Sequence, residues 1–208
     1  MERSLPQVPG VVVFDVGGVL SAQEGGVPEV AAALGVSADV LGPAYWRYRD
    51  GYDRGDDART YWTAVLTDLG LTASDVEARI EAVDAVDAAR WGAPTAASAE
   101  LLAAVCASGT RTGILSNAPQ SLAGVVRAAA WSRPLEHLVF SCDLRAAKPE
   151  PAAYAAVEEA FGVPGSEVVF LDDRPVNVEA ARERGWRAHL WTGADDAWGA
   201  LRAEAGRG

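Results

Sequence analysis

The chain has 208 residues, of which 50% are hydrophobic, so it can bury a full core as one domain with a large insertion or as two small domains. Its formal net charge of −11 argues against nucleic acid and against anionic membranes as partners, because both would repel such a surface. The cysteines, Cys106 and Cys142, are too few for a disulfide scaffold and are expected to be buried thiols. Residues 1–4 lack the apolar region of a signal peptide and no apolar run has the length of a membrane span, so the expected compartment is the cytoplasm.

The first predicted element is a strand over residues 11–14. Its four apolar residues, three of them β-branched, are typical of a strand buried on both faces of a parallel sheet. Asp15 follows this strand directly, and Gly17 and Gly18 come shortly after. Because ligands of open α/β sheets bind beyond the carboxyl ends of the strands, Asp15 is placed for nucleophilic catalysis or metal binding, and the glycines let a substrate approach the backbone. The alternative is that Asp15 only starts a turn or caps a helix.

A long insertion is expected after this strand, because roughly a hundred residues precede the next one and a crossover connection needs far fewer. Its periodicity is helical, and no strand pattern competes with it. We predict an all-helical domain over residues 22–92 and a core domain formed by residues 1–21 and 93–208. The helices expected in the insertion span 28–34, 40–48, 58–69 and 74–90.

From residue 93 onward, predicted helices alternate with predicted strands. This alternation predicts the α/β class, with a doubly wound parallel sheet and right-handed crossovers. The residues after Gly193 predict a short helix and a frayed end. The helices are expected within 93–110, 121–130, 151–162 and 177–185, and the strands over 112–115, 139–141, 168–171 and 186–191.

Polar side chains follow the later strands at the points where those strands end. Ser116 and Asn117 offer two hydrogen-bonding groups that could hold transferred oxygens. Lys148 precedes a proline and could supply a positive charge, and the adjacent carboxylates of Asp172 and Asp173 suit a divalent cation. Each feature has a plainer interpretation as a turn, a solvated charge or a helix cap. One shared site explains all of them together, since the carboxyl ends of parallel strands meet at one edge.

This series of strand-end residues resembles the haloacid dehalogenase-like hydrolases, most of which are Mg²⁺-dependent phosphatases. The resemblance covers the chain apart from residues roughly 22–92. It implies a Rossmann-like core, an inserted helical cap that closes over the active site, and a small phosphorylated metabolite as substrate. We expect a monomer or a homodimer, with no nucleic-acid or membrane partner. The resemblance rests on Asp15, Ser116-Asn117, Lys148-Pro149 and Asp172-Asp173 in this order.

The resemblance also implies a role for each of these residues. Asp15 would attack the phosphoryl group and form an aspartyl-phosphate once a cation has neutralised the substrate. Lys148 would offset negative charge, and Ser116 and Asn117 would hydrogen-bond the phosphoryl oxygens. The ligands of Mg²⁺ would be Asp15, the backbone carbonyl of Gly17 and a carboxylate of the pair Asp172 and Asp173, and the sequence leaves open which of the two it is.

Gly17 departs from the common pattern of the resembling family. Most of its phosphatases have an aspartate at this position that protonates the leaving oxygen, help that is worth roughly 10²–10⁴ in rate. Some sugar-1-phosphate phosphatases of the superfamily lack it, as do the 2-haloacid dehalogenases, which use no metal. The dehalogenases also lack the acidic pair, so Asp172 and Asp173 favour a phosphatase. The alternatives are a catalytically weak member retained for binding and, less favoured, a 2-haloacid dehalogenase.

The stretch 45–55 of the insertion concentrates aromatic residues and arginines that would suit a sugar or another polar leaving group. We select Arg47 and Tyr48 as substrate-binding candidates, beside Gly17, Gly18, Ser116 and Asn117 in the core. The alternative is that the aromatic residues pack the cap core and the arginines are solvated. His137 and His189 adjoin apolar strands and are expected to be structural.

Overall fold

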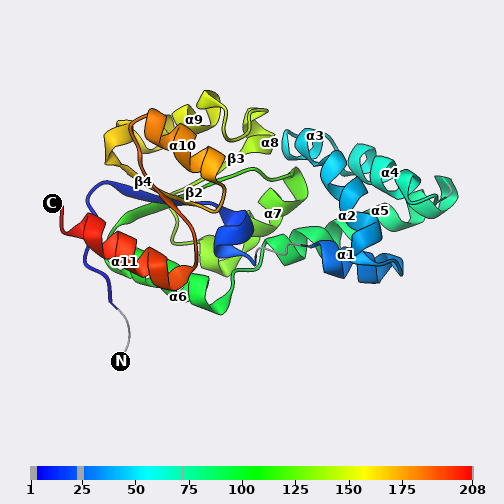
Figure 1. The fold of residues 1–208 in the computed structure, drawn as a ribbon, viewed down its shortest axis with the longest axis horizontal. Helices are drawn as coiled ribbons and strands as arrows, with labels where there is room; N and C mark the ends of the chain where they lie inside the picture. The colour runs from blue at the N-terminus through cyan, green and yellow to red at the C-terminus, as the bar shows by residue number, and fades with distance from the viewer. Residues whose placement is uncertain (1–3, 23–25, 72, 208) are drawn as a thin grey trace.

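The computed structural model describes residues 4–22, 26–71 and 73–207. Figure 1 shows two bodies along the long axis of the molecule, an α/β core and a bundle of helices attached to one end of it. The chain leaves the core after the first strand, forms the bundle, and returns to complete the sheet.

A five-stranded parallel sheet forms the centre of the core, with the strand order β3-β2-β1-β4-β5. Strand β1 lies in the middle, where Phe14 at its end is in register with Ile114 of β2 and Leu171 of β4. Three carboxyl ends therefore lie side by side, and the predicted doubly wound α/β sheet is confirmed. The strands are β1 (Val11–Phe14), β2 (Arg111–Ser116), β3 (His137–Phe140), β4 (Val168–Asp172) and β5 (Arg187–Leu190).

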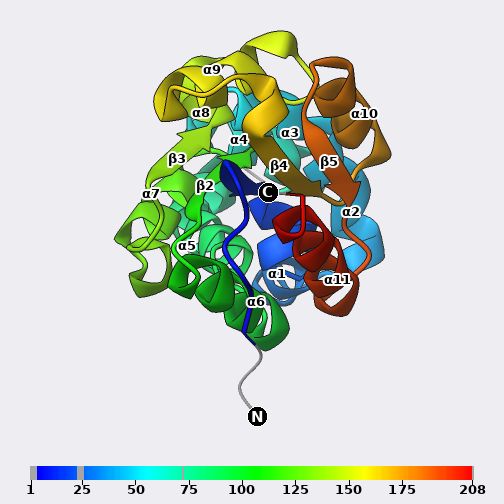
Figure 2. The same cartoon turned by 90° about the vertical axis from the view of Figure 1, so that its left-hand side faces the viewer.

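Helices cover both faces of the sheet, because successive residues of a strand face opposite sides. Val12 and Phe14 of β1 pack with α6, α7 and α11, whereas Val11 and Val13 pack with α9 and α10. Figure 2 shows α9 and α10 on one side of the sheet and α6 and α11 on the other. These helices are α6 (Ala96–Ala107), α7 (Gln120–Ala128), α9 (Pro151–Phe161), α10 (Pro175–Glu183) and α11 (Ala194–Ala205), joined by the short η2 (Ala130–Ser132), α8 (Ser141–Leu144) and η3 (Gly165–Glu167).

The bundle has an apolar core of its own, with Tyr45, Tyr52 and Trp62 among its largest buried side chains. The helices expected between residues 22 and 92 are present, and the structure adds a short one, α3, between those expected at 40–48 and 58–69. No single helix of the described residues is long and apolar enough to span a membrane, although α1 and α2, bent by 115° to each other, meet that requirement as a pair. The helices are α1 (Val27–Leu34), α2 (Ala38–Arg47), α3 (Arg49–Asp53), α4 (Ala58–Asp68) and α5 (Ala73–Trp91).

The helix predicted after Gly193 is confirmed, and it is longer than expected, since it extends to Ala205. Helix α11 has 12 residues and buries Trp198 and Leu201 against the sheet. Glu204 is buried near its end and pairs with Arg187 at 2.9 Å and with His189 at 3.0 Å, both on β5. The apolar contacts of α11 and the two pairs of Glu204 hold the helix against the sheet and its edge strand β5. The composition of the segment does not indicate these contacts.

We expect Leu201→Ala to lower the free energy of unfolding by about 2–5 kcal/mol, because it removes a fully buried side chain from the packed face of α11. Urea unfolding followed by circular dichroism measures the change. Ala203→Ser, at an exposed position of the same helix, is the matched control and should change stability by less than about 0.5 kcal/mol. Equal effects of the two substitutions would contradict the packed position of the helix.

Candidate active site

Three carboxylates meet at the carboxyl edge of the sheet, beside the central strand. Asp15 follows β1, Asp172 ends β4 and Asp173 comes next in the chain. One oxygen of each lies within 4.8 Å of the others. The register of β1 with β4 brings them together, and the backbone N–H of Asp15 donates to the carbonyl of Leu171 at 2.9 Å.

Lys148 is buried between two of these carboxylates. Its Nζ lies 2.9 Å from Oδ2 of Asp15 and 2.6 Å from Oδ2 of Asp172, and its side chain is only 1% exposed. Asp172 also accepts from the backbone N–H of Arg174 at 2.9 Å and from Nδ2 of Asn177 at 3.0 and 3.1 Å. Both oxygens of Asp172 are thus engaged inside the protein, whereas Asp173 is half-buried and lines the cavity above the site.

The charge of the cluster is unbalanced, since three carboxylates face one ammonium. Burial raises the pKa of Asp15 from an ordinary 3.8 to about 7, helped by the nearby carboxylates of Asp172 and Asp173 and opposed by Lys148. Burial also raises the pKa of Asp173, with Asp172 adding to the effect. Burial disfavours the charged form of Lys148, but Asp15 and Asp172 outweigh it and raise the pKa of the ammonium. With all groups ionised, the cluster has two negative charges in excess, which a divalent cation would offset.

The loop after Asp15 is a single wide helical turn, η1 (Val16–Leu20), closed by a bond from the N–H of Ser21 to the carbonyl of Val16. Gly18 has a φ of 74°, and a Cβ there would lie 2.4 Å from Oδ2 of Asp173. A Cβ on Gly17 would lie 3.1 Å from Cζ3 of Trp91, whose indole packs over this glycine. Both glycines line the cavity. A side chain added at Gly17 would contact Trp91, and one added at Gly18 would contact Asp173.

Asn117 is bound to the backbone of Lys148 on both sides of its carboxamide. Its Nδ2 donates to the carbonyl of Lys148 at 2.9 Å, and its Oδ1 accepts from the N–H of Lys148 at 2.8 Å. The side chain expected to hold phosphoryl oxygens instead fixes the segment that carries the lysine. Ser116 is buried at the end of β2, and Asn117 lines the cavity.

The cavity above Asp15 has a volume of about 190 Å³ and is closed on one side by the cap. Arg47 and Tyr48, expected to bind substrate, are not among its lining residues and both contact Asp68 of α4, so the structure does not bring these two candidates to the site. Helix α2 ends at Arg47 and α3 begins at Arg49, so the two candidates lie at the junction of these helices. The cap residues that line the cavity are Trp46, Arg49, Asp53 and Trp91.

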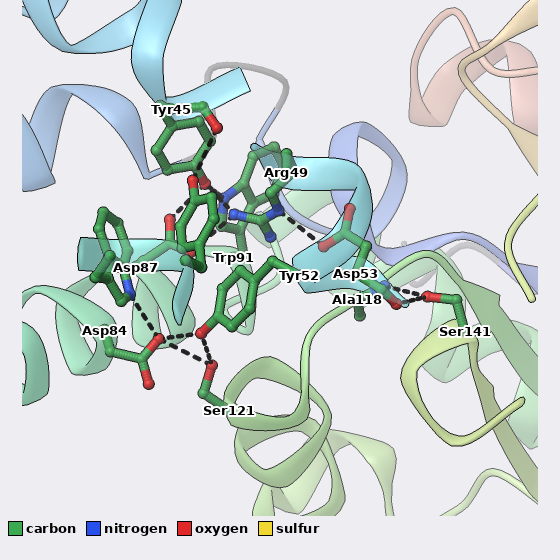
Figure 3. Close-up of polar contacts among 12 residues, drawn as sticks. Tyr45, Arg49, Tyr52, Asp53, Asp84, Asp87, Trp91, Ala118, Ser121 and Ser141 are labelled. Atoms are coloured by element: carbon green, nitrogen blue, oxygen red, sulfur yellow. Dashed lines mark hydrogen bonds and ion pairs between the residues drawn. The ribbon is translucent and has the colours of Figure 1, made fainter. Parts of the chain in front are cut away.

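Arg49 is the cap residue that the sequence analysis missed, although Tyr45, Arg49 and Asp53 recur at helical spacing. Figure 3 shows its guanidinium at the centre of a buried network. Nε lies 2.8 Å from Oδ1 of Asp53, and Nη1 lies 3.0 Å from Oδ2 of Asp87 and also donates to the hydroxyl of Tyr45. That hydroxyl donates to Asp87 at 2.6 Å and accepts from Nε1 of Trp91 at 2.8 Å. The network thereby fixes the indole that lies over Gly17.

Contacts between cap and core adjoin this network. The hydroxyl of Tyr52 lies 2.9 Å from that of Ser121 on α7, and both bond to Asp84 of α5. Ser141 donates to the backbone carbonyl of Asp53 at 2.5 Å and accepts from the N–H of Ala118 at 2.9 Å. Figure 3 shows these bonds where α3 meets the loop after β2.

The fold and the site define a hydrolase with an aspartate at the carboxyl end of the central strand, and residues 9–185 match the family model of the haloacid dehalogenase-like hydrolases. The chain belongs to this family. It is 35% identical over 80 residues to haloacetate dehalogenase H-2 of Moraxella sp. (38% of this chain, 36% of that protein) and 37% identical over 84 residues to phosphatase MT3486 of Mycobacterium tuberculosis (39% of each). These matches span less than two-fifths of those relatives. Enolase-phosphatase E1 of Streptomyces avermitilis is 28% identical over 187 residues (82% of this chain, 70% of that protein).

Solved structures of the family share the fold. L-2-haloacid dehalogenase from Xanthobacter autotrophicus superposes with a TM-score of 0.67 at 21% identity, covering 88% of this chain and 77% of that chain. A family enzyme from Bacteroides thetaiotaomicron, in complex with magnesium and inorganic phosphate, gives a TM-score of 0.63 at 20% identity, covering 88% and 93%. At this level of identity the likeness describes the fold, and the chemistry has to be argued from the residues of this chain.

We expect the metal-free protein to lose stability as the pH rises from about 4 to about 7. In this range folded Asp15 keeps its proton while an unfolded chain releases it near 3.8, so the folded state binds more protons and the free energy of unfolding falls as pH rises. Urea unfolding at several pH values, in a chelator, measures the slope. Asp15→Asn should remove this part of the slope, and an unchanged slope would contradict the raised pKa.

Proposed function

We propose that the protein is a Mg²⁺-dependent phosphatase that hydrolyses a small phosphorylated metabolite through an aspartyl-phosphate on Asp15. The single observation that carries this proposal is the set of three carboxylates around one buried ammonium. Two excess negative charges beside a candidate nucleophile suit a hard divalent cation with oxygen ligands. The small cavity, which has charged groups beside the indoles of Trp46 and Trp91, suits a phosphoryl group attached to a compact, sugar-like alcohol.

The donor set fits Mg²⁺ and supports one assignment within the acidic pair. Asp173 lines the cavity, while both oxygens of Asp172 are bonded to Lys148, Arg174 or Asn177. We therefore assign Asp15, the carbonyl of Gly17 and Asp173 as direct ligands, and Asp172 as the residue that positions Lys148. A cation held there would offset the negative charge that otherwise keeps a phosphate ester from a carboxylate.

The chain's own residues would then carry the transfer. A carboxylate oxygen of Asp15 forms a bond to phosphorus as the bond to the leaving oxygen breaks, and water later cleaves the aspartyl-phosphate and restores the carboxylate. Lys148 stabilises negative charge on Asp15 and on the phosphoryl oxygens. Asn117 holds the backbone of Lys148, so the ammonium needs no reorganisation during the reaction.

A second candidate function, dehalogenation of a 2-haloacid, is less well supported. The curated relatives include a haloacetate dehalogenase as well as phosphatases, so similarity alone does not separate the two. The acidic pair argues against the dehalogenase, because that chemistry has no need for a second and third carboxylate beside the nucleophile. A binding-only role is disfavoured for the same reason, since it requires neither the nucleophile nor its lysine.

We expect hydrolysis of p-nitrophenyl phosphate that depends on Mg²⁺ and falls by roughly 10³-fold or more in Asp15→Asn, because an amide is a poor nucleophile. Release of p-nitrophenol, followed by absorbance, measures it. Asp143→Asn is the matched control, since this half-exposed carboxylate pairs with Arg127 outside the cavity and should leave the rate unchanged. Chloride release from 2-chloropropionate without any phosphatase activity would favour the dehalogenase instead.

We expect the two members of the acidic pair to respond differently to amidation. Asp173→Asn should weaken Mg²⁺ binding at least about tenfold, because it removes an anionic ligand. Asp172→Asn should chiefly lower the free energy of unfolding, because buried Lys148 loses one of its two carboxylates. Calorimetric titration with Mg²⁺ and urea unfolding compare the variants. The reverse pattern would exchange the roles of the two residues.

A further inference from the structure

The indole of Trp91 occupies the space beside Asp15 where a proton-donating side chain on residue 17 would lie. Gly17 has no side chain to donate from, and Trp91 packs over it with Cζ3 at 3.1 Å from the position of a Cβ. Trp91 is fixed there by its bond to Tyr45. A proton for the leaving oxygen therefore has to come from another wall of the cavity, and this question arises only if the proposed phosphatase function holds.

The groups that line the cavity leave one candidate among the described residues. Asp15 is the nucleophile, and Asp173 is assigned to the metal. Lys148 is locked between two carboxylates, and an arginine does not give up its proton in proteins. The remaining acid in the lining is Asp53 of the cap.

Asp53 is held toward the core by its backbone and its side chain. It is the last residue of α3, and its carbonyl accepts from Ser141, which in turn accepts from the N–H of Ala118 in the loop after β2. Its Oδ1 bonds to Arg49, and Oδ2 takes no part in that bond. Figure 3 shows the carboxylate bonded to the guanidinium through one oxygen. The side chain of Asp53 is 17% exposed.

The charges around Asp53 favour a carboxyl that can hold and release a proton. Arg49 faces two carboxylates, Asp53 and Asp87, and cannot fully compensate both. Burial raises the pKa of Asp53 and of Asp87, against the lowering influence of Arg49, and Asp50 adds further negative charge near Asp53. Asp87 is 1% exposed and lies behind Arg49, outside the cavity lining, so only Asp53 of this pair can reach a substrate.

We propose that Asp53 replaces the acid absent at position 17 and transfers the proton in both half-reactions. In the first, the carboxyl proton of Asp53 passes to the leaving oxygen as the P–O bond breaks and Asp15 bonds to phosphorus, which releases an alcohol. In the second, the Asp53 carboxylate takes a proton from water as the water oxygen bonds to phosphorus and the Asp15–phosphorus bond breaks. Phosphate leaves, and both side chains return to their starting protonation.

The test compares Asp53→Asn with Asp87→Asn, because each variant removes one carboxylate from Arg49 but only the first changes the cavity. An asparagine at 53 can still accept from Arg49, and Asp53→Glu keeps a carboxyl should the amide disturb folding. Stopped-flow release of p-nitrophenol separates formation of the aspartyl-phosphate from its hydrolysis, and phenyl and alkyl phosphates supply poorer leaving groups.

Asp53→Asn should keep the stoichiometric p-nitrophenol burst within about threefold of the wild-type rate, because this leaving group needs little protonation, while the steady-state rate falls roughly 10²-fold. Alkyl phosphate cleavage should fall by roughly 10²–10⁴-fold. Asp53→Glu should recover part of the alkyl phosphate activity, and Asp87→Asn should lower all rates by one common factor.

If Asp53→Asn lowers the rates on all these substrates by one common factor, or leaves them unchanged, Asp53 does not transfer the proton. A p-nitrophenol burst in that variant would still support Asp15 as the nucleophile. A wild-type enzyme without burst or turnover on any aryl phosphate would contradict the proposed function, and this inference with it.

Discussion

One buried ammonium organises the active edge of this protein. Lys148 joins the carboxylate that follows β1 to the one that ends β4, at distances below 3 Å and with almost no contact with water. A pair of buried charges of this kind is stabilising only when its remaining bonding capacity is met, and here Asn177 and the N–H of Arg174 donate to the remaining positions of Asp172. The third carboxylate, that of Asp173, is not one of the two that Lys148 contacts as ion-pair partners. The same arrangement that stabilises the edge therefore leaves negative charge in excess beside Asp15.

The cap and the core share a polar centre rather than a purely apolar contact. Arg49 stands in the wall of the cavity and at the edge of the cap's aromatic core, with Tyr45 as the link between them. The hydroxyl of Tyr45 has one donated and two accepted bonds, which is its full capacity. Movement of the cap therefore alters the surroundings of Arg49, Asp53 and Trp91 together.

The sequence was sufficient for the parts of the site that belong to the sheet. Parallel strands bring their carboxyl ends to one edge, so Asp15, Lys148 and the acidic pair could be placed together from their positions after predicted strands and from the resemblance that they carry. The cap residues that line the cavity were not identified from the sequence. Arg47 is exposed and Arg49 is buried, although they stand two residues apart at the junction of two short helices, where periodicity does not predict which side chain faces the core. The task of Asn117 was missed for a similar reason, because its partner is a backbone segment 31 residues away.

The indole of Trp91 also restricts how this enzyme can evolve. A single substitution of Gly17 by aspartate would supply the acid that related phosphatases use, but the new side chain would meet a ring that is bonded to the cap's polar centre. Truncation of the ring on its own would open a hole where the cap joins the core. Each change is unfavourable without the other, so the two residues form an epistatic pair. An acidic side chain at position 17 therefore requires that the packing of Trp91 change with it.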